Sequence, residues 1–276
     1  MMFAGAIRRA GSVQVNVARL IFAALLLLVT IAAANLNLHL SFTQYAYLSI
    51  SGFIGLVFGD TYLFKSFQVN GARISMLIMS LAPAISAILA FVILGESLSS
   101  WGVAGIVVTT AGIAIVVVAN QQSRTERFKM TAAGMVYGFF GAVGQGAGLV
   151  FARLAFNDGE INGFVATFVR IAASLVVLIP LAFASRRIKD PIGTFSRDKR
   201  ALVLTIGGAI FGPYLGITFS LVAITYTKVG IAATLMATVP ILMLPLVRVI
   251  YRERLTWHAI VGACVAVAGV AILFLR

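Results

Sequence analysis

The 276-residue sequence has few of the side chains that most catalytic and metal-binding sites require. It contains one cysteine, two histidines and eight acidic residues. Cys264 therefore cannot form an internal disulfide, while His39 and His258 lie near the ends of apolar segments with no clustered pair of acids beside them. An intramembrane enzyme needs a nucleophile with a base, or a set of metal ligands. Neither enzymatic activity nor a cofactor or metal ion is expected.

Apolar residues dominate the chain instead. They make up 61% of the sequence against 11% charged residues, and the mean hydropathy is +1.05. Apolar runs of about 20 residues are long enough to cross a bilayer as helices, which satisfy their own backbone hydrogen bonds in lipid. The sequence predicts an all-α, multi-pass membrane protein with nine spans, near 16–36, 43–65, 73–94, 99–120, 131–153, 162–184, 201–226, 229–250 and 256–275.

The sequence resembles itself when it is shifted by 157 positions. The strongest match pairs residues 74–83 with 231–240, and upstream Arg19 matches Arg170 at a shift of 151, because the second half has a longer early loop. Other pairs at a shift of 157 are Gly55 with Gly212, Gly59 with Gly216, Thr61 with Thr218 and Glu96 with Glu253. Duplicated bundles of membrane helices are typical of transporters that bind their solute between the two copies.

This repeat predicts the domain organisation. Residues 1–120 form a first repeat with four spans, 121–130 a cytoplasmic linker, and 131–276 a second repeat with five spans. About 20 residues of a first helix are therefore expected to be absent from this chain, through truncation, a misassigned start codon or true loss. An odd number of spans per repeat inverts the second copy, which makes Pro83 and Pro240 paired hinge candidates, with a packing kink as the alternative.

The net charge of +13 is concentrated in alternate loops. Of the 21 lysine and arginine residues, 17 fall on one side of the predicted membrane. The positive-inside rule then places the amino terminus of this chain in the cytoplasm and the carboxyl terminus outside a cytoplasmic membrane. A basic surface for nucleic acid is not implied, because the cations follow the topology instead of forming one patch.

Several motifs recur in both halves at fixed spacing. They are Leu81-Ala-Pro83, the stretch 94–98 (Leu-Gly-Glu-Ser-Leu), Gly105 and Gly112, and in the second half Pro240, 252–255 (Arg-Glu-Arg-Leu), Gly262 and Gly269. Together they resemble the EamA-type branch of the drug/metabolite transporter (DMT) superfamily, although Arg252 replaces the glycine of the motif. The resemblance implies a ten-helix carrier of two inverted repeats around a central cavity, which exports amino acids, other metabolites or drugs.

Asp60 is the only acid predicted to lie within a span. An ionisable residue in the membrane is a functional candidate, because its burial costs free energy. Lys65 is a poor partner, about 140° around the same helix, whereas Arg19 lies at a similar depth. Asp60 is therefore either one half of a structural ion pair with Arg19, a proton-coupling acid of a transport cavity, or a helix cap.

Five residues complete the predicted cavity. Arg170 lies inside its span without a nearby acid and could hold an anionic solute group, or could have a paired or snorkelling structural role. Gln145 lies in a glycine-rich span that favours close helix contact, and could line the cavity as a neutral hydrogen-bonding group. Tyr62, Tyr214 and Phe219 are candidates for aromatic walls, with packing or lipid contact as their alternatives.

These observations predict a secondary active transporter for efflux of small metabolites or drugs by alternating access, with protons as a candidate coupling ion. The expected partners are the lipid bilayer, a small-molecule solute and protons. The sequence leaves open whether the chain forms a homodimer. The alternative function is a non-transporting membrane scaffold or sensor derived from a transporter. That alternative is favoured if the polar residues are fully paired and no cavity separates the halves.

Overall fold

The computed structural model describes residues 2–119, 131–184, 191–238, 241 and 257–274, and every regular element in these ranges is helical. The all-α prediction is confirmed for this part of the chain. The elements are α1 (Met2–Ala10), α2 (Ser12–Ala33), α3 (Phe42–Gly52), the π-helix η1 (Phe53–Gly59), α4 (Asp60–Met79), α5 (Ala82–Leu94), α6 (Ser100–Ala119), α7 (Ala132–Asn157), α8 (Gly163–Ala184), α9 (Pro191–Arg197), α10 (Lys199–Ala209), the π-helix η3 (Ile210–Tyr214), α11 (Leu215–Tyr226), α12 (Val229–Met236) and α14 (Trp257–Phe274).

Six described helical segments are long and apolar enough to cross a membrane, and the chain is a multi-pass membrane protein. They are Ser12–Ala33, Phe42–Gly71, Ile74–Leu94, Ala132–Asn157, Gly163–Ala184 and Lys199–Tyr226, and shorter apolar helices cover Ser100–Val116 and Ile260–Ile272. Two of these segments divide α4, because Gly71 has non-helical backbone angles (φ 75°, ψ 166°) that kink this helix. The count of nine spans stays a prediction, because most of 237–250 lies outside the described residues, as do Pro240 and the predicted linker 121–130.

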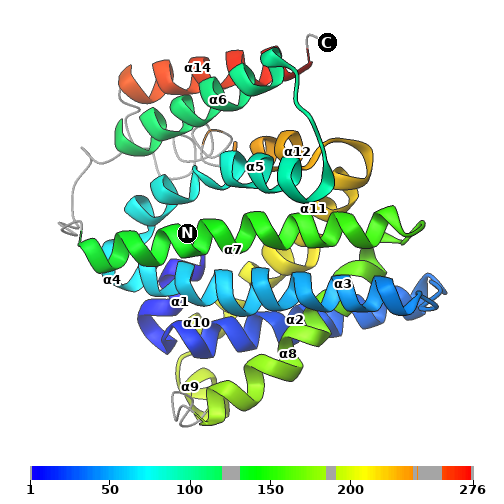
Figure 1. Cartoon of the computed structure of the whole chain (residues 1–276). Helices are drawn as coiled ribbons and strands as arrows, with labels where there is room; N and C mark the ends of the chain where they lie inside the picture. The colour runs from blue at the N-terminus through cyan, green and yellow to red at the C-terminus, as the bar shows by residue number, and fades with distance from the viewer. Residues whose placement is uncertain (1, 120–130, 185–190, 239–240, 242–256, 275–276) are drawn as a thin grey trace.

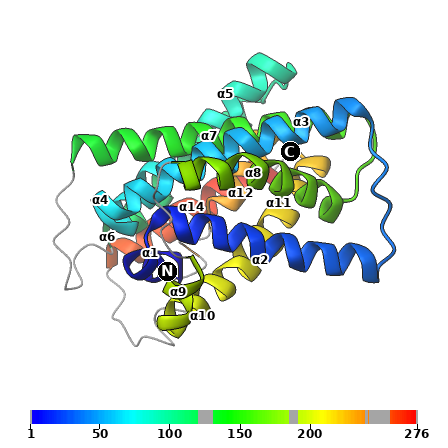
Figure 2. The ribbon, with the colours of Figure 1, turned by 90° about the horizontal axis from the view of Figure 1, so that it is seen from below.

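The helices form a layered bundle. Figure 1 shows α6 and α14 side by side at one edge and α2, α8 and α10 towards the opposite edge, with α7 running through the middle. Viewed from below, α7 lies along α3 and α4, which it contacts over most of its length (Figure 2). One apolar core surrounds Leu149 and Val150 of α7, and a second joins α2 to α8 around Leu27 and Ile171. Segments distant in sequence therefore meet around α7.

Two helix irregularities recur at equivalent positions of the two halves. The π-helix η1 begins at Phe53 and η3 begins at Ile210, 157 positions later. Likewise α4 ends at Met79 and α12 ends at Met236, again 157 apart. A π-helical turn widens the helix and changes which side chains share a face, and such turns are frequent at functional sites. The repeat seen in sequence thus carries the same backbone irregularities in both halves.

Helices α6 and α14 contact each other reciprocally through glycine. A Cβ added to Gly112 would lie 2.7 Å from Cα of Ala266, and one added to Gly269, the counterpart of Gly112, would lie 2.8 Å from Cα of Thr109. Thr109 is itself the counterpart of Ala266, so each contact repeats the other with the halves exchanged. The same pair of repeat positions therefore forms both close contacts between α6 and α14.

Pro83 does not kink a continuous helix. The expected span 73–94 is interrupted at Ser80–Leu81, and Pro83 occupies the first turn of α5, where its missing N–H needs no partner inside the helix. The helix is therefore interrupted before Pro83, and Pro83 itself does not bend it. Pro83 is buried at this junction.

Helix α1 is held against α10 by a surface ion pair. Arg9 Nη1 donates to Asp198 Oδ2 at 2.9 Å, and Asp198 Oδ1 accepts from the backbone N–H of Ala201 at 3.0 Å as the N-cap of α10. The hydrogen bond from Arg9, followed by the bond from Ala201, lowers the pKa of Asp198 below its usual value. Both side chains are partly exposed, so the contribution to stability is small and screened by salt.

Acid is therefore expected to loosen α1. Because the pKa of Asp198 in the folded protein is below the roughly 3.9 of a free aspartate, the ion pair contributes fully above that pH and its contribution is lost as the pH falls through the folded value. Amide hydrogen exchange in residues 2–10, corrected for intrinsic rates, should accelerate in acid. In the Arg9→Gln variant, exchange should already be faster at neutral pH and should depend less on acid. An equal acid response in both proteins would contradict this.

Candidate functional site

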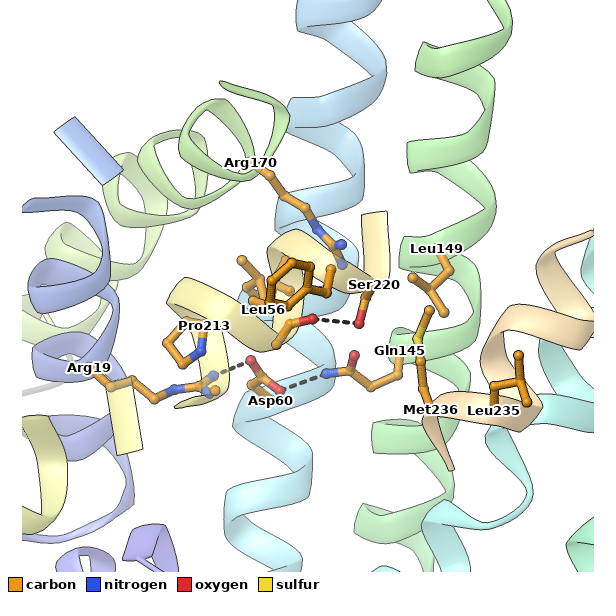
Figure 3. Close-up of a pocket in the computed structure, with 14 residues that line it drawn as sticks. Arg19, Leu56, Asp60, Gln145, Leu149, Arg170, Pro213, Ser220, Leu235 and Met236 are labelled. Atoms are coloured by element: carbon orange, nitrogen blue, oxygen red, sulfur yellow. Dashed lines mark hydrogen bonds and ion pairs between the residues drawn. The ribbon is translucent and has the colours of Figure 1, made fainter. Parts of the chain in front are cut away.

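A cavity of about 540 Å³ lies between the two halves of the chain. Its walls combine residues of α2, η1 and α4 from the first half with residues of α7, α8, η3, α11 and α12 from the second. Most of the lining is apolar, and the polar side chains in it are Arg19, Asp60, Gln145, Arg170 and Ser220. Figure 3 shows these polar groups converging on the space enclosed by the helices. An apolar pocket with a few convergent polar groups is the usual form of a small-molecule site.

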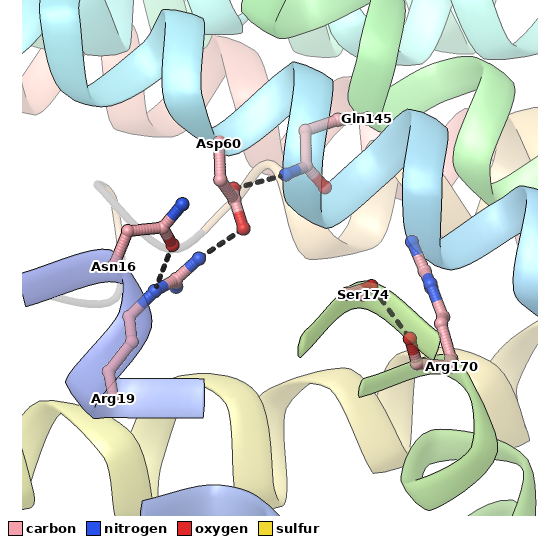
Figure 4. Close-up of polar contacts among 6 residues, drawn as sticks. All are labelled: Asn16, Arg19, Asp60, Gln145, Arg170 and Ser174. Atoms are coloured by element: carbon pink, nitrogen blue, oxygen red, sulfur yellow. Dashed lines mark hydrogen bonds and ion pairs between the residues drawn. The ribbon is translucent and has the colours of Figure 1, made fainter. Parts of the chain in front are cut away.

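Asp60 is the centre of a buried polar cluster. Its side chain is only 4% exposed, yet both carboxylate oxygens have donors. Arg19 Nη2 donates to Oδ2, and Gln145 Nε2 donates to Oδ1 at 2.7 Å. Arg19 Nε in turn donates to Asn16 Oδ1 at 2.9 Å (Figure 4). The Asp60 charge is therefore neutralised by Arg19, the partner proposed from their similar depth.

Glycines bring Gln145 within reach of Asp60. Asp60 directly follows η1, whose last residue is Gly59. A Cβ on Gly144 of α7 would lie 2.9 Å from the backbone nitrogen of Gly59, so the two backbones approach too closely for a larger residue at position 144. Small residues allow such contacts between membrane helices. The glycine-rich surface of α7 thus positions the neighbouring Gln145 at the carboxylate.

Aromatic rings hold the other side of the cluster. The guanidinium carbon of Arg19 lies 4.6 Å from the ring centroid of Phe64 and 5.1 Å from that of Phe3. Both distances fall in the range of cation–π attraction. Arg19 therefore connects α1, α2 and α4 as well as neutralising Asp60.

Arg170 is the second buried cation of the cavity, and among the described residues its charge is near Asp60 without a direct ion pair to it. Its side chain belongs to α8, is 2% exposed and lines the cavity. Within the part of the chain that the structure describes, Nε of its guanidinium has no hydrogen-bond partner. Gly55 and Gly148 leave space for this group, since a Cβ on Gly148 would lie 2.9 Å from Nη2. Figure 4 shows the guanidinium of Arg170 separate from the Arg19–Asp60 pair.

The three predicted aromatic residues are placed differently. Phe219 lines the cavity, whereas Tyr62 and Tyr214 are not part of its wall. The Tyr62 ring lies 5.0 Å from Nζ of Lys65 in an aromatic cluster with Tyr137, Phe58 and Phe140, and the Tyr214 hydroxyl hydrogen-bonds to Thr30 Oγ1 at 2.8 Å. Among the described residues, no three His, Cys, Asp or Glu side chains come together as metal ligands.

Several lining residues were not found from sequence. Ser220 and the apolar residues Leu56, Leu149, Ile217, Leu235 and Met236 all line the cavity. Their types are common throughout the membrane spans, so composition does not single them out. Gly212 and Gly216 also line it, and their match to Gly55 and Gly59 was the one available signal.

Glu96 lies in the turn between α5 and α6 but binds a helix of the other half. Glu96 Oε2 accepts from the N–H of Val229 at 2.9 Å, at the first residue of α12, and Arg153 Nε lies 3.7 Å from its other oxygen. A carboxylate is favourable at a helix N-terminus. Glu96 therefore links the two halves beside the cavity wall.

Comparisons with known proteins agree with this architecture. A model of the EamA-like transporter family matches residues 1–118 and 132–275. A WAT1-related protein of Arabidopsis thaliana is 31% identical over 128 residues, which are 44% of this chain and 34% of the relative's length. The match thus spans about a third of that relative. One protein crystal structure superposes with a TM-score of 0.72 at 17% identity, covering 99% of this chain and 93% of the other, and shares the fold.

Proposed function

The chain belongs to the EamA-like transporter family of the drug/metabolite transporter superfamily, and from this premise we propose that it is a secondary active exporter of small metabolites, such as amino acids, or of drugs. The observation that carries the proposal is the cavity between the halves, in which ionisable side chains are buried at membrane depth. Buried ionisable groups in a span are costly and mark solute or ion pathways.

The recurring helix irregularities support alternating access. If the two repeats are inverted, the breaks after Met79 and Met236 and the π-helices η1 and η3 lie at opposite faces of the membrane. Rocking of one repeat against the other would then open the cavity to each side in turn. Pro83 lies beside one of these breaks and retains its role as a hinge candidate.

Asp60 is the candidate coupling group of this mechanism. It lies in the cavity wall between Arg19 and Gln145, where protonation would release both partners. A proton gradient could supply the energy for export in this way. The charge distribution supports a cytoplasmic amino terminus and an outer carboxyl terminus in the cell membrane. The cavity and the unpartnered Nε of Arg170 favour transport over the scaffold alternative.

Filling the cavity should stop export. Ser220 lines the cavity from α11, and a Ser220→Trp side chain would occupy space needed by the solute. Val176 of α8 is 74% exposed on the apolar surface. Val176→Trp is therefore a matched control that introduces the same tryptophan side chain outside the cavity. Extracellular metabolites of cells expressing each protein at equal levels should be compared with empty-vector cells.

We expect a small set of solutes to accumulate outside with the unmodified chain and with Val176→Trp, and to fall several-fold with Ser220→Trp. The solutes would identify the substrate. Accumulation that is the same for the chain and the empty vector would refute the transporter proposal. Equal accumulation with Ser220→Trp would show that the solute takes another route.

A further inference from the structure

Arg170 is a buried cation without a direct ion pair among the described residues. Nε of its guanidinium has no hydrogen-bond partner among the described residues, although Arg170 is 2% exposed and lies in the cavity wall. Burying a charge at membrane depth without a direct partner is energetically costly. Such a residue persists where another component supplies the missing charge. The cavity that Arg170 lines is a space next to this guanidinium that a solute can occupy.

The charge balance of the cavity indicates the sign of that component. The charged residues of its lining are Arg19, Asp60 and Arg170, which give a net charge of +1. Asp60 is paired directly with Arg19, and its other oxygen accepts from Gln145, so its single negative charge is shared between two arginines, only one of which it contacts. One added negative charge would make the cavity neutral, whereas a cationic solute would raise its charge to +2.

The shape and polarity of the site indicate the rest of the solute. A guanidinium presents parallel N–H groups that match a carboxylate in a bidentate arrangement. Beyond Arg170 the wall is formed mainly by apolar side chains, among them Leu56, Ile217 and Phe219. Figure 3 places Arg170 at one side of the pocket and the apolar residues around the space in front of it. A cavity of about 540 Å³ suits a small organic molecule.

We propose that the solute of this cavity is a small organic monocarboxylate with an apolar body, and that its carboxylate binds the guanidinium of Arg170. This proposal rests on the transporter function and narrows it to one charge class. Because glycine at positions 55 and 148 leaves room for the guanidinium, these glycines are part of the site. Arg170 and Arg19 occupy matching positions of the repeat. In this proposal Arg19 neutralises the carboxylate of Asp60, and Arg170 binds the carboxylate of the solute.

Two ligand pairs of matched shape test this with the unmodified full chain in lipid nanodiscs. The pairs are benzoate with benzamide, and 4-methylpentanoate with 4-methylpentanamide. At about a hundredfold excess over Kd, a bound ligand should raise the melting temperature by roughly 5 °C. We expect the carboxylates to do so and the neutral amides to have little effect. Equal rises in melting temperature within each pair, or no rise with either carboxylate, would overturn the proposal. This test needs only the unmodified chain.

Variants then assign the effect to one side chain. Arg170→Gln should abolish the carboxylate shift, while Arg170→Lys keeps part of it as a point charge without the bidentate geometry. Arg153→Gln is the matched control, because Arg153 is a partly buried arginine outside the cavity lining that bonds the carbonyl of Ile224. A full carboxylate shift in Arg170→Gln would overturn the assignment. If Arg170→Gln does not fold, Arg170→Lys provides the test. A carboxylate-induced rise in melting temperature as large as that of the unmodified chain would refute the bidentate contact.

Flux in proteoliposomes separates this proposal from the transporter function. Counterflow of labelled benzoate that Arg170→Gln abolishes supports both. Carboxylate binding without flux of any solute would uphold the site and refute transport. Flux of a neutral or cationic solute that is unchanged in Arg170→Gln would uphold transport and refute the monocarboxylate site.

Discussion

Replacing Asp60 by asparagine is expected to abolish export and to reduce the amount of folded protein. The substitution keeps the shape of the side chain but leaves Arg19 as an uncompensated buried cation. Removing one member of a buried ion pair costs about 3–5 kcal/mol, much of it from the charge that is left behind. The second buried arginine of the cavity, Arg170, would add to the positive charge. The melting temperature and the yield of monodisperse protein measure the structural part of this effect.

A double variant separates structure from transport. In Arg19→Gln/Asp60→Asn both charges are removed, and the two amides can hydrogen-bond to each other and to Gln145. Replacing both partners of a buried ion pair is often nearly neutral, so folding should recover most of the loss seen in Asp60→Asn. Asp198→Asn is the control, because Asp198 is a partly exposed acid outside the cavity lining, and asparagine can keep its N-cap bond to Ala201. It should retain both folding and export.

Export by the double variant then decides between the two roles of Asp60. If folding recovers and export does not, Asp60 takes part in the transport cycle, as a proton-coupling acid would. Recovery of both would show that the Arg19–Asp60 pair is structural only. A single Asp60→Asn variant with unchanged melting temperature and export would contradict both the energetic argument and the proposed coupling role.

The features that sequence could predict are those set by composition and by depth along a helix. The all-helical fold and the positions of the long spans follow from runs of apolar residues. The pairing of Asp60 with Arg19 follows from helix geometry, because a rise of about 1.5 Å per residue gives each residue a depth in its span. The 157-residue shift likewise anticipated the equivalence of Gly55 and Gly59 with the cavity glycines Gly212 and Gly216.

The features that sequence could not predict depend on rotation about the helix axis and on long-range contacts. Hydropathy does not set which face of a uniformly apolar helix turns inward, so Tyr62 and Tyr214 were placed in the cavity wall while Ser220 was not. The π-helix η1 also changes the phase of residues after position 59. The amide partner of Glu96, Val229, lies 133 positions away in sequence, and only the packing of the two halves brings these residues together.

The contact between α7 and η1 should tolerate no added methyl group. A Cβ on Gly144 would lie 2.9 Å from the backbone nitrogen of Gly59 and 2.9 Å from the carbonyl oxygen of Ile54. Neither is a flexible side chain that can rotate away, so the helices must separate. We expect Gly144→Ala to cost about 3 kcal/mol or more, at the upper end of overpacking effects. Separation would also withdraw Gln145 from Asp60 and widen the cavity.

Gly102→Ala in α6 is the matched control. It adds the same methyl group to another buried glycine, but its Cβ would lie 3.5 Å from the nearest atom, Cβ of Leu98, which is an ordinary contact. The melting temperatures of both variants in detergent should be compared with that of the unmodified chain. Gly59→Ala should cost less than Gly144→Ala, because a Cβ on Gly59 would lie 3.1 Å from its nearest atom, the carbonyl carbon of Gly144. If Gly144→Ala has the same melting temperature as Gly102→Ala, α7 and η1 can move apart without loss of stability. The Gln145–Asp60 hydrogen bond would then not depend on their close approach.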